Sequence, residues 1–95
     1  MQAENAAMKN KTDLDSIAHR LETTRTALGL SQAEFADAAG IARNTYNQWE
    51  RGKGRPQLDG AIALCRAFNL TLDWIYFGDM NGLSYQLAQK LTSAA

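Results

Sequence analysis

Cysteine and proline are nearly absent from this 95-residue chain, which contains one of each. With Cys65 alone, neither an intramolecular disulfide nor a cysteine-based zinc site can form, and we expect a reducing, cytoplasmic environment. No apolar run approaches the roughly 20 residues that span a bilayer, and the N-terminus lacks the apolar core of a signal peptide. The composition therefore predicts a single globular domain that is neither exported nor embedded in a membrane.

Alternating strand patterns are also missing, whereas apolar residues recur at three- and four-residue steps along most of the chain. Thr12-Asp13-Leu14-Asp15 and Ser31-Gln32-Ala33-Glu34 both match capping boxes, and Gly29 and Gly40 stand where helices should end. The sequence therefore predicts an all-α fold of five to six helices. We expect them over residues 12–28, 31–39, 41–51, 58–68, 72–77 and 83–91.

The chain divides into three segments by pattern. Residues 1–11 lack periodicity and are predicted to form a flexible N-terminal arm, whereas residues 12–78 hold the capped helices. Residues 79–95 are predicted to form a C-terminal helix with one apolar stripe, made by Leu83, Leu87 and Leu91. This stripe has two interpretations: it completes the chain's own core, or it meets the same stripe of a second copy in a dimer interface.

Residues 30–49 combine two short helices with a sharp turn between them. Ala36 is small where the helices must cross, Gly40 permits a positive φ in the turn, and Ile41 and Trp49 are apolar anchors. Polar side chains remain on the outer face of the second helix: Arg43, Asn44, Asn47 and Gln48. Such groups suit base edges in the major groove, because arginine pairs with guanine O6 and N7, and asparagine or glutamine with adenine N6 and N7.

The segment LSQAEFADAAGIARNTYNQWERGKGRP resembles the Cro/repressor-type helix-turn-helix family of bacterial and phage regulators, also called the xenobiotic-response-element family. The chain departs from the family at Ala42, where a Ser or Thr cap is frequent, and at Asn69, where Gly is usual. The resemblance implies a lambda-repressor-like domain whose third helix enters the major groove. The matching points are Arg25, Gly29-Leu30-Ser31-Gln32, Ala36, Gly40, Trp49-Glu50-Arg51-Gly52 and Pro56.

This resemblance also implies which side chains would contact DNA. Base recognition falls to the outer face of the third helix, that is to Arg43, Asn44, Asn47 and Gln48. Phosphate contacts, which set register without carrying sequence information, fall to Gln32, Thr45, Arg51, Lys53 and Arg55. The aromatic residues Tyr46, Trp49, Phe68, Trp74 and Phe77 are expected to pack in the core.

The net charge of zero conceals an uneven distribution that agrees with these assignments. Residues 43–55 carry four positive side chains and one negative, whereas residues 1–42 carry four and six, and residues 56–95 two and three. The basic excess therefore lies in the segment predicted to contact DNA, and the remainder is mildly repulsive to phosphate.

We predict a sequence-specific DNA-binding transcription regulator, a small repressor that binds a palindromic operator as a homodimer with half-sites one helical turn apart. One alternative is the antitoxin of a toxin–antitoxin pair, which represses its own operon and binds a partner toxin. Another is an adaptor that retains the fold without operator recognition. No convergent nucleophile, base and pocket are evident, so neither an enzyme nor a cofactor or metal is predicted.

Overall fold

The computed structural model describes residues 12–94, so the predicted N-terminal arm over residues 1–11 lies outside the described residues. The described part consists of helical elements and contains no strand, which confirms the predicted all-α fold. In chain order these elements are α2 (Leu14–Ala27), α3 (Gln32–Ala39), α4 (Arg43–Glu50), α5 (Leu58–Phe68), the π-helical turn η1 (Asp73–Phe77) and α6 (Tyr85–Ala94).

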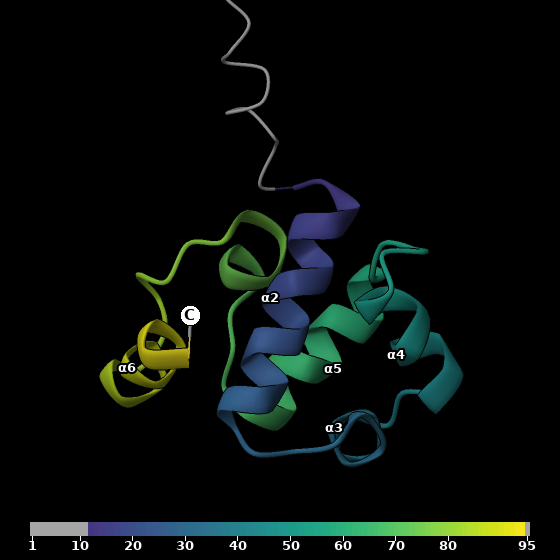
Figure 1. Cartoon of the computed structure of the whole chain (residues 1–95), viewed down its shortest axis with the longest axis horizontal. Helices are drawn as coiled ribbons and strands as arrows, with labels where there is room; N and C mark the ends of the chain where they lie inside the picture. Colours follow the sequence, from purple (N-terminus) through teal and green to yellow (C-terminus); the bar gives the residue numbers. More distant parts are fainter. Residues whose placement is uncertain (1–11, 95) are drawn as a thin grey trace, which may run out of the picture.

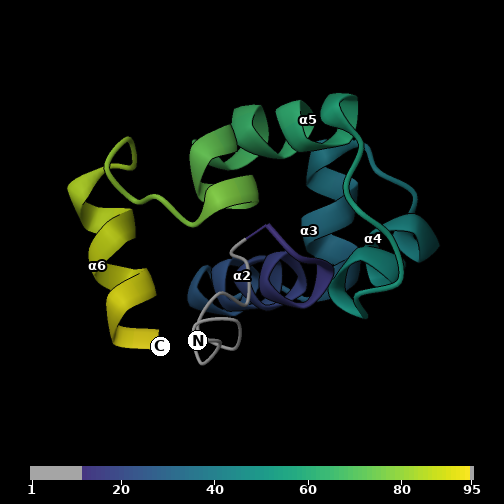
Figure 2. The same ribbon diagram turned by 90° about the horizontal axis from the view of Figure 1, so that it is seen from above.

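Helix α2 is central, and the other elements are arranged around it (Figure 1). It contacts α4, η1 and α6, while α3 packs against both α4 and α5. Helices α6 and α4 lie at opposite ends of the molecule in both of two perpendicular views (Figures 1 and 2). The longest dimension is 43 Å.

Local capping explains where most of these helices begin and end. Ser31 and Glu34 form the predicted capping box of α3, with Glu34 N donating to Ser31 Oγ over 3.0 Å. The predicted cap of α2 was wrong by one residue, because the Asp13 carboxylate accepts from Ser16 N over 2.7 Å and takes the place assigned to Thr12. Asn69 ends α5 at a φ of 60°, a left-handed conformation that asparagine tolerates.

Aromatic side chains hold α3, α4 and α5 together. Phe35 is fully buried and stacks on Phe68 with ring centroids 4.4 Å apart, and the Tyr46 ring meets its edge at 5.2 Å. The predicted burial of Tyr46 and Trp49 is confirmed. The predicted burial of Phe77 is wrong. Its side chain is 56% exposed, because the π-turn rotates it away from the face where a 3.6-residue period would put it.

The C-terminal leucine stripe packs on the chain itself. Leu87 and Leu91 are buried in the same core as Ile17 and Leu21, and Leu83 packs partly against it. Helix α6 contacts α2 directly. Leu87 and Leu91 therefore have little surface left for a second copy, which favours the interpretation that the stripe completes the chain's own core.

A buried polar contact joins α2 to η1. Thr24 is 1% exposed; its hydroxyl donates to Arg20 O over 2.6 Å and accepts from Trp74 Nε1 over 2.9 Å. Beside it, the Arg20 guanidinium donates through Nε and Nη2 to Ile75 O at 3.1 and 3.0 Å. These contacts satisfy backbone and indole groups that would otherwise be buried unpaired.

Thr24→Val is expected to lower the free energy of unfolding by about 1–3 kcal/mol, because it keeps the side-chain shape but leaves the Trp74 indole N–H without an acceptor. Urea unfolding followed by tryptophan fluorescence measures the change. Thr26→Val is the matched control, since the exposed Thr26 hydroxyl bonds only to backbone carbonyls of its own helix. Equal losses in both variants would contradict the role assigned to the Trp74 contact.

Candidate nucleic-acid interface

The turn between α3 and α4 fixes the crossing of these two helices. Gly40 caps α3 at a φ of 71°, in the left-handed region that favours glycine. Beyond it, Ile41 N donates back to Ala36 O over 2.9 Å, which closes the end of α3. Ala42 then precedes α4 without a side-chain cap, as its methyl group predicts.

The outer face of α4 presents polar side chains that take no part in packing. Arg43, Asn44, Thr45 and Gln48 are exposed, whereas Tyr46 and Trp49 on the opposite face are buried. Asn44, Thr45 and Gln48 have no side-chain hydrogen-bond partner among the described residues. Their hydrogen-bonding capacity is therefore available to an external ligand.

Behind this face, the carboxylate of Glu50 joins three helices. Its Oε2 accepts from Arg25 Nε of α2 over 2.7 Å, and its Oε1 accepts from Arg25 Nη2 over 3.1 Å and from Gln32 Nε2 of α3 over 2.9 Å. The Tyr46 hydroxyl donates to Oε2. Arg25 also donates through Nη1 to Leu30 O over 2.9 Å. The network was not predicted; Arg25 and Glu50 were both present in the family motif, but their pairing depends on tertiary contact.

Burial and hydrogen bonding oppose each other at Glu50. The side chain of Glu50 is 4% exposed and that of Arg25 14%. Burial alone raises the pKa of Glu50, but hydrogen bonds from Arg25, Tyr46 and Gln32 outweigh it and hold that pKa below its ordinary value. Burial and the bond to Glu50 raise the pKa of Tyr46, so its hydroxyl remains a donor at neutral pH. The carboxylate is thus ionised and fully partnered.

The same network determines the position of Gln32 and Asn47. Asn47 Nδ2 donates to Gln32 Oε1 over 2.9 Å, while Gln32 donates to Glu50. Asn47, which was predicted to contact a base, is half-buried. Its amide supports Gln32, the residue that was predicted to contact a phosphate. The contact of Asn47 with a base stays a prediction, and the bond to Gln32 is a role that the sequence pattern did not indicate.

The basic loop after α4 divides into two parts. Arg51 and Lys53 are exposed and have no side-chain partner among the described residues. Arg55 is exposed as well, but its Nη1 donates to Thr12 O and so connects the loop to the start of α2. The side chains of Arg51 and Lys53 are therefore available for a phosphate contact, whereas Arg55 would first have to release Thr12 O.

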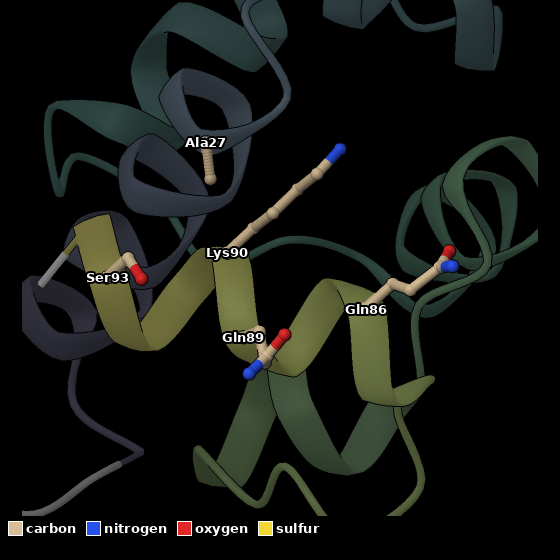
Figure 3. Close-up of a pocket in the computed structure, with 5 residues that line it drawn as sticks. All are labelled: Ala27, Gln86, Gln89, Lys90 and Ser93. Atoms are coloured by element: carbon tan, nitrogen blue, oxygen red, sulfur yellow. The ribbon is translucent and has the colours of Figure 1, made fainter.

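An open groove on the described residues is remote from α4. It has a volume of about 680 Å³ and lies between α6 and the end of α2, lined by Ala27, Gln86, Gln89, Lys90 and Ser93 (Figure 3). The described residues contain no group of His, Cys, Asp or Glu side chains that could hold a metal ion. The concentration of exposed polar groups on α4 is therefore separate from this groove.

Two short helices that cross at a glycine turn, the second with a polar outer face, define a helix-turn-helix protein. The model of the Helix-turn-helix family matches residues 21–75, and the chain belongs to this family. The match includes α3, α4 and α5 in full, and it confirms the resemblance inferred from the motif.

Three curated relatives are named as transcription regulators. The chain is 32% identical over 57 residues to the cryptic phage CTXphi transcriptional repressor RstR of Vibrio cholerae, covering 60% of this chain and 51% of RstR. It is 33% identical over 64 residues to the HTH-type transcriptional regulator DicA of Escherichia coli, covering 67% and 47%. For the HTH-type transcriptional activator BcrR of Enterococcus faecalis the identity is 28% over 60 residues, covering 63% and 29%.

The chain spans about half the length, or less, of these three relatives. The comparison with solved structures gave no significant match. None of the described helices is long and apolar enough to cross a membrane.

Proposed function

We propose that this chain is a sequence-specific DNA-binding transcription regulator that acts as a small repressor. The observation that carries the proposal is the outer face of α4, where Asn44, Thr45 and Gln48 are exposed without side-chain partners in the described part of the chain. Membership of the helix-turn-helix family and the similarity to RstR, which is named a transcriptional repressor, support it.

The proposed contacts follow the exposure of the side chains. Arg43, Asn44 and Gln48 would contact base edges, with Asn47 at the margin because its amide group is engaged with Gln32. Phosphates would be held by the start of α3, where Gln32 is the first helical residue, and by an exposed set on α4 and the following loop. That set comprises Thr45, Arg51 and Lys53, with Arg55 after release from Thr12.

In vitro selection from random duplex DNA tests this proposal. We expect enrichment of a motif with guanine and adenine at positions that Arg43, Asn44 and Gln48 can reach. A pool that stays unenriched while the protein remains folded would overturn sequence-specific DNA binding. Pull-down from native cells then separates a stand-alone repressor from an antitoxin, because only the antitoxin would retain a stoichiometric toxin.

Arg51→Ala is expected to weaken binding to all DNA sequences alike and to reduce the slope of log K against log salt by about one unit, because one phosphate contact is removed. Fluorescence anisotropy over a salt series measures the slope. Lys90→Ala on α6 is the matched control, since it removes an equal charge at the other end of the molecule. An unchanged slope for Arg51→Ala would exclude the phosphate contact.

We further propose that two copies bind a palindromic operator, because one short helix contacts few base pairs and a two-fold pair doubles the interface. Contact through the outer side of α6 would put the two α4 helices at the far ends of a particle built from 43 Å units. That arrangement exceeds the ~34 Å between major grooves one turn apart. The dimer contact is therefore proposed for the α4 side of the molecule.

Leu58 is the apolar side chain that fits this contact. It is 56% exposed at the start of α5, and two residues further on Gly60 packs so closely on α4 that a Cβ there would lie 2.6 Å from the Trp49 ring. Leu58→Glu is expected to halve the number of protein chains per palindromic duplex in sedimentation equilibrium. Tyr85→Glu, at a 74% exposed residue of α6, should leave it unchanged. The reverse pattern would assign the dimer contact to α6.

A further inference from the structure

An exposed ion pair spans the turn between α3 and α4. Asp37 Oδ1 accepts from Arg43 Nε over 3.0 Å, and Asp37 Oδ2 accepts from Arg43 Nη2 over 2.6 Å. The carboxylate thus grips the side edge of the guanidinium through two parallel hydrogen bonds. Both partners are well exposed, with 67% of the Arg43 side chain and 52% of the Asp37 side chain accessible.

Neither charge is explained by the stability of its own helix. Asp37 lies in the last turn of α3, where the helix dipole disfavours a negative charge, and Arg43 is the first residue of α4, where it disfavours a positive one. Exposed ion pairs also contribute little to folding stability. The remaining consequence of the ion pair is geometric, because the pair restrains the long Arg43 side chain, which would otherwise sample many rotamers.

The restraint leaves the end of Arg43 open. A guanidinium has five N–H groups, and the bond to Asp37 uses that on Nε and one on Nη2. Both N–H groups on Nη1 and the second on Nη2 remain, and one from each nitrogen form the parallel pair that matches guanine O6 and N7. Asp37 therefore holds Arg43 without occupying the edge needed for guanine.

We propose that Asp37 is a positioning residue that fixes the guanidinium of Arg43 for guanine and so determines the preference for guanine at one position of each half-site. The proposal rests on the proposed function, because Arg43 must face a base in the complex. Asp37 itself contacts no base, and its negative charge opposes the attraction between the protein and DNA in general. It therefore sharpens discrimination while weakening non-specific binding.

Asp37→Ala tests this role in the full chain, with the duplex obtained by selection and the same duplex carrying adenine in place of the guanine assigned to Arg43. We expect the ratio of the two affinities to fall about fivefold, because an unrestrained arginine loses part of its bidentate discrimination. Affinity for random duplex should rise, since one negative charge is removed. Asp73→Ala is the matched control and should leave the ratio unchanged, because Asp73 is exposed, in η1, and without a side-chain partner among the described residues.

A double-mutant cycle tests whether Asp37 changes the guanine-to-adenine ratio through Arg43. In the Arg43→Ala background, Asp37→Ala should leave the guanine-to-adenine ratio unchanged while still raising affinity for random duplex. An unaltered ratio in Asp37→Ala alone, or a ratio that rises, would overturn the proposal; a rise would mean that Asp37 competes with guanine for Arg43.

Two further results separate this inference from the proposed function. In the free protein, the Arg43 Nε–H should be protected from solvent exchange in the wild type and lose that protection in Asp37→Ala. Lack of protection in the wild type would contradict the ion pair. Selection that yields a guanine-containing motif insensitive to Asp37→Ala overturns the inference alone. Selection that yields no motif overturns both.

Discussion

Glu50→Ala should lower the free energy of unfolding by about 3–5 kcal/mol, because it leaves the buried charge of Arg25 without its partner. Domains of this kind have total stabilities of about 5–15 kcal/mol, so this loss is a large fraction of the total. The Tyr46 hydroxyl and the Gln32 amide lose their common acceptor in the same step. Urea unfolding by circular dichroism measures the loss.

The control for this prediction removes both charges together. Arg25→Met with Glu50→Leu replaces the pair by apolar side chains of similar length and should recover much of the stability lost in Glu50→Ala. The recovery is expected to be incomplete, because Tyr46 and Gln32 still lack an acceptor. A loss below about 1 kcal/mol in Glu50→Ala would mean that the pair contributes no more than a surface ion pair.

Acid should weaken the fold through the same carboxylate. The pKa of Glu50 is lower in the folded chain than its ordinary value, so its ionised form favours folding. This contribution is complete above the pKa of the unfolded chain and is lost as the pH falls through the lower folded pKa. Unfolding curves at descending pH should show this loss in the wild type and its absence in the Arg25→Met, Glu50→Leu variant.

Arg43→Ala and Gln48→Ala should each lower affinity for the selected operator by about 1–3 kcal/mol, because each removes a side chain proposed to discriminate one base pair. Affinity for random duplex should stay nearly unchanged in Gln48→Ala and fall by much less than operator affinity in Arg43→Ala, which also removes one positive charge. Competition binding with both duplexes at one salt concentration measures the two effects.

Gln89→Ala is the matched control for Gln48→Ala, because Gln89 is an exposed glutamine on α6 at the opposite end of the molecule. It should change neither affinity. Equal losses on operator and random DNA would remove Arg43 and Gln48 from base recognition. Both residues are exposed, so circular dichroism should show that these variants remain folded.

Local chemistry was enough to predict the frame of the helix-turn-helix. Ser31 with Glu34 signals a capped helix, Gly40 a turn with positive φ, and Asn69 a left-handed helix end, and each of these acts within a few residues. Phe77 was misassigned because periodicity assumes 3.6 residues per turn, whereas η1 is a π-turn.

The contacts around the candidate site required the tertiary structure. Arg25 and Glu50 are 25 residues apart, and their pairing depends on how α2 lies against α4. Helical spacing put Asn47 on the outer face with Gln48, but the approach of α3 draws its amide toward Gln32. The leucine stripe of α6 was compatible with two partners, and only the packing of α6 on α2 distinguishes them.

The division between Glu50 and the outer face of α4 has a consequence for how this protein can diversify. Asn44 and Gln48 have neither a packing role nor a side-chain partner in the described chain, so their exchange is expected to cost folding almost nothing. Glu50 anchors three helices at once, and any exchange there disturbs all of them. Under the proposed function, new operators are therefore accessible by single substitutions at these two positions on an unaltered scaffold, with the part of the preference assigned to Arg43 retained.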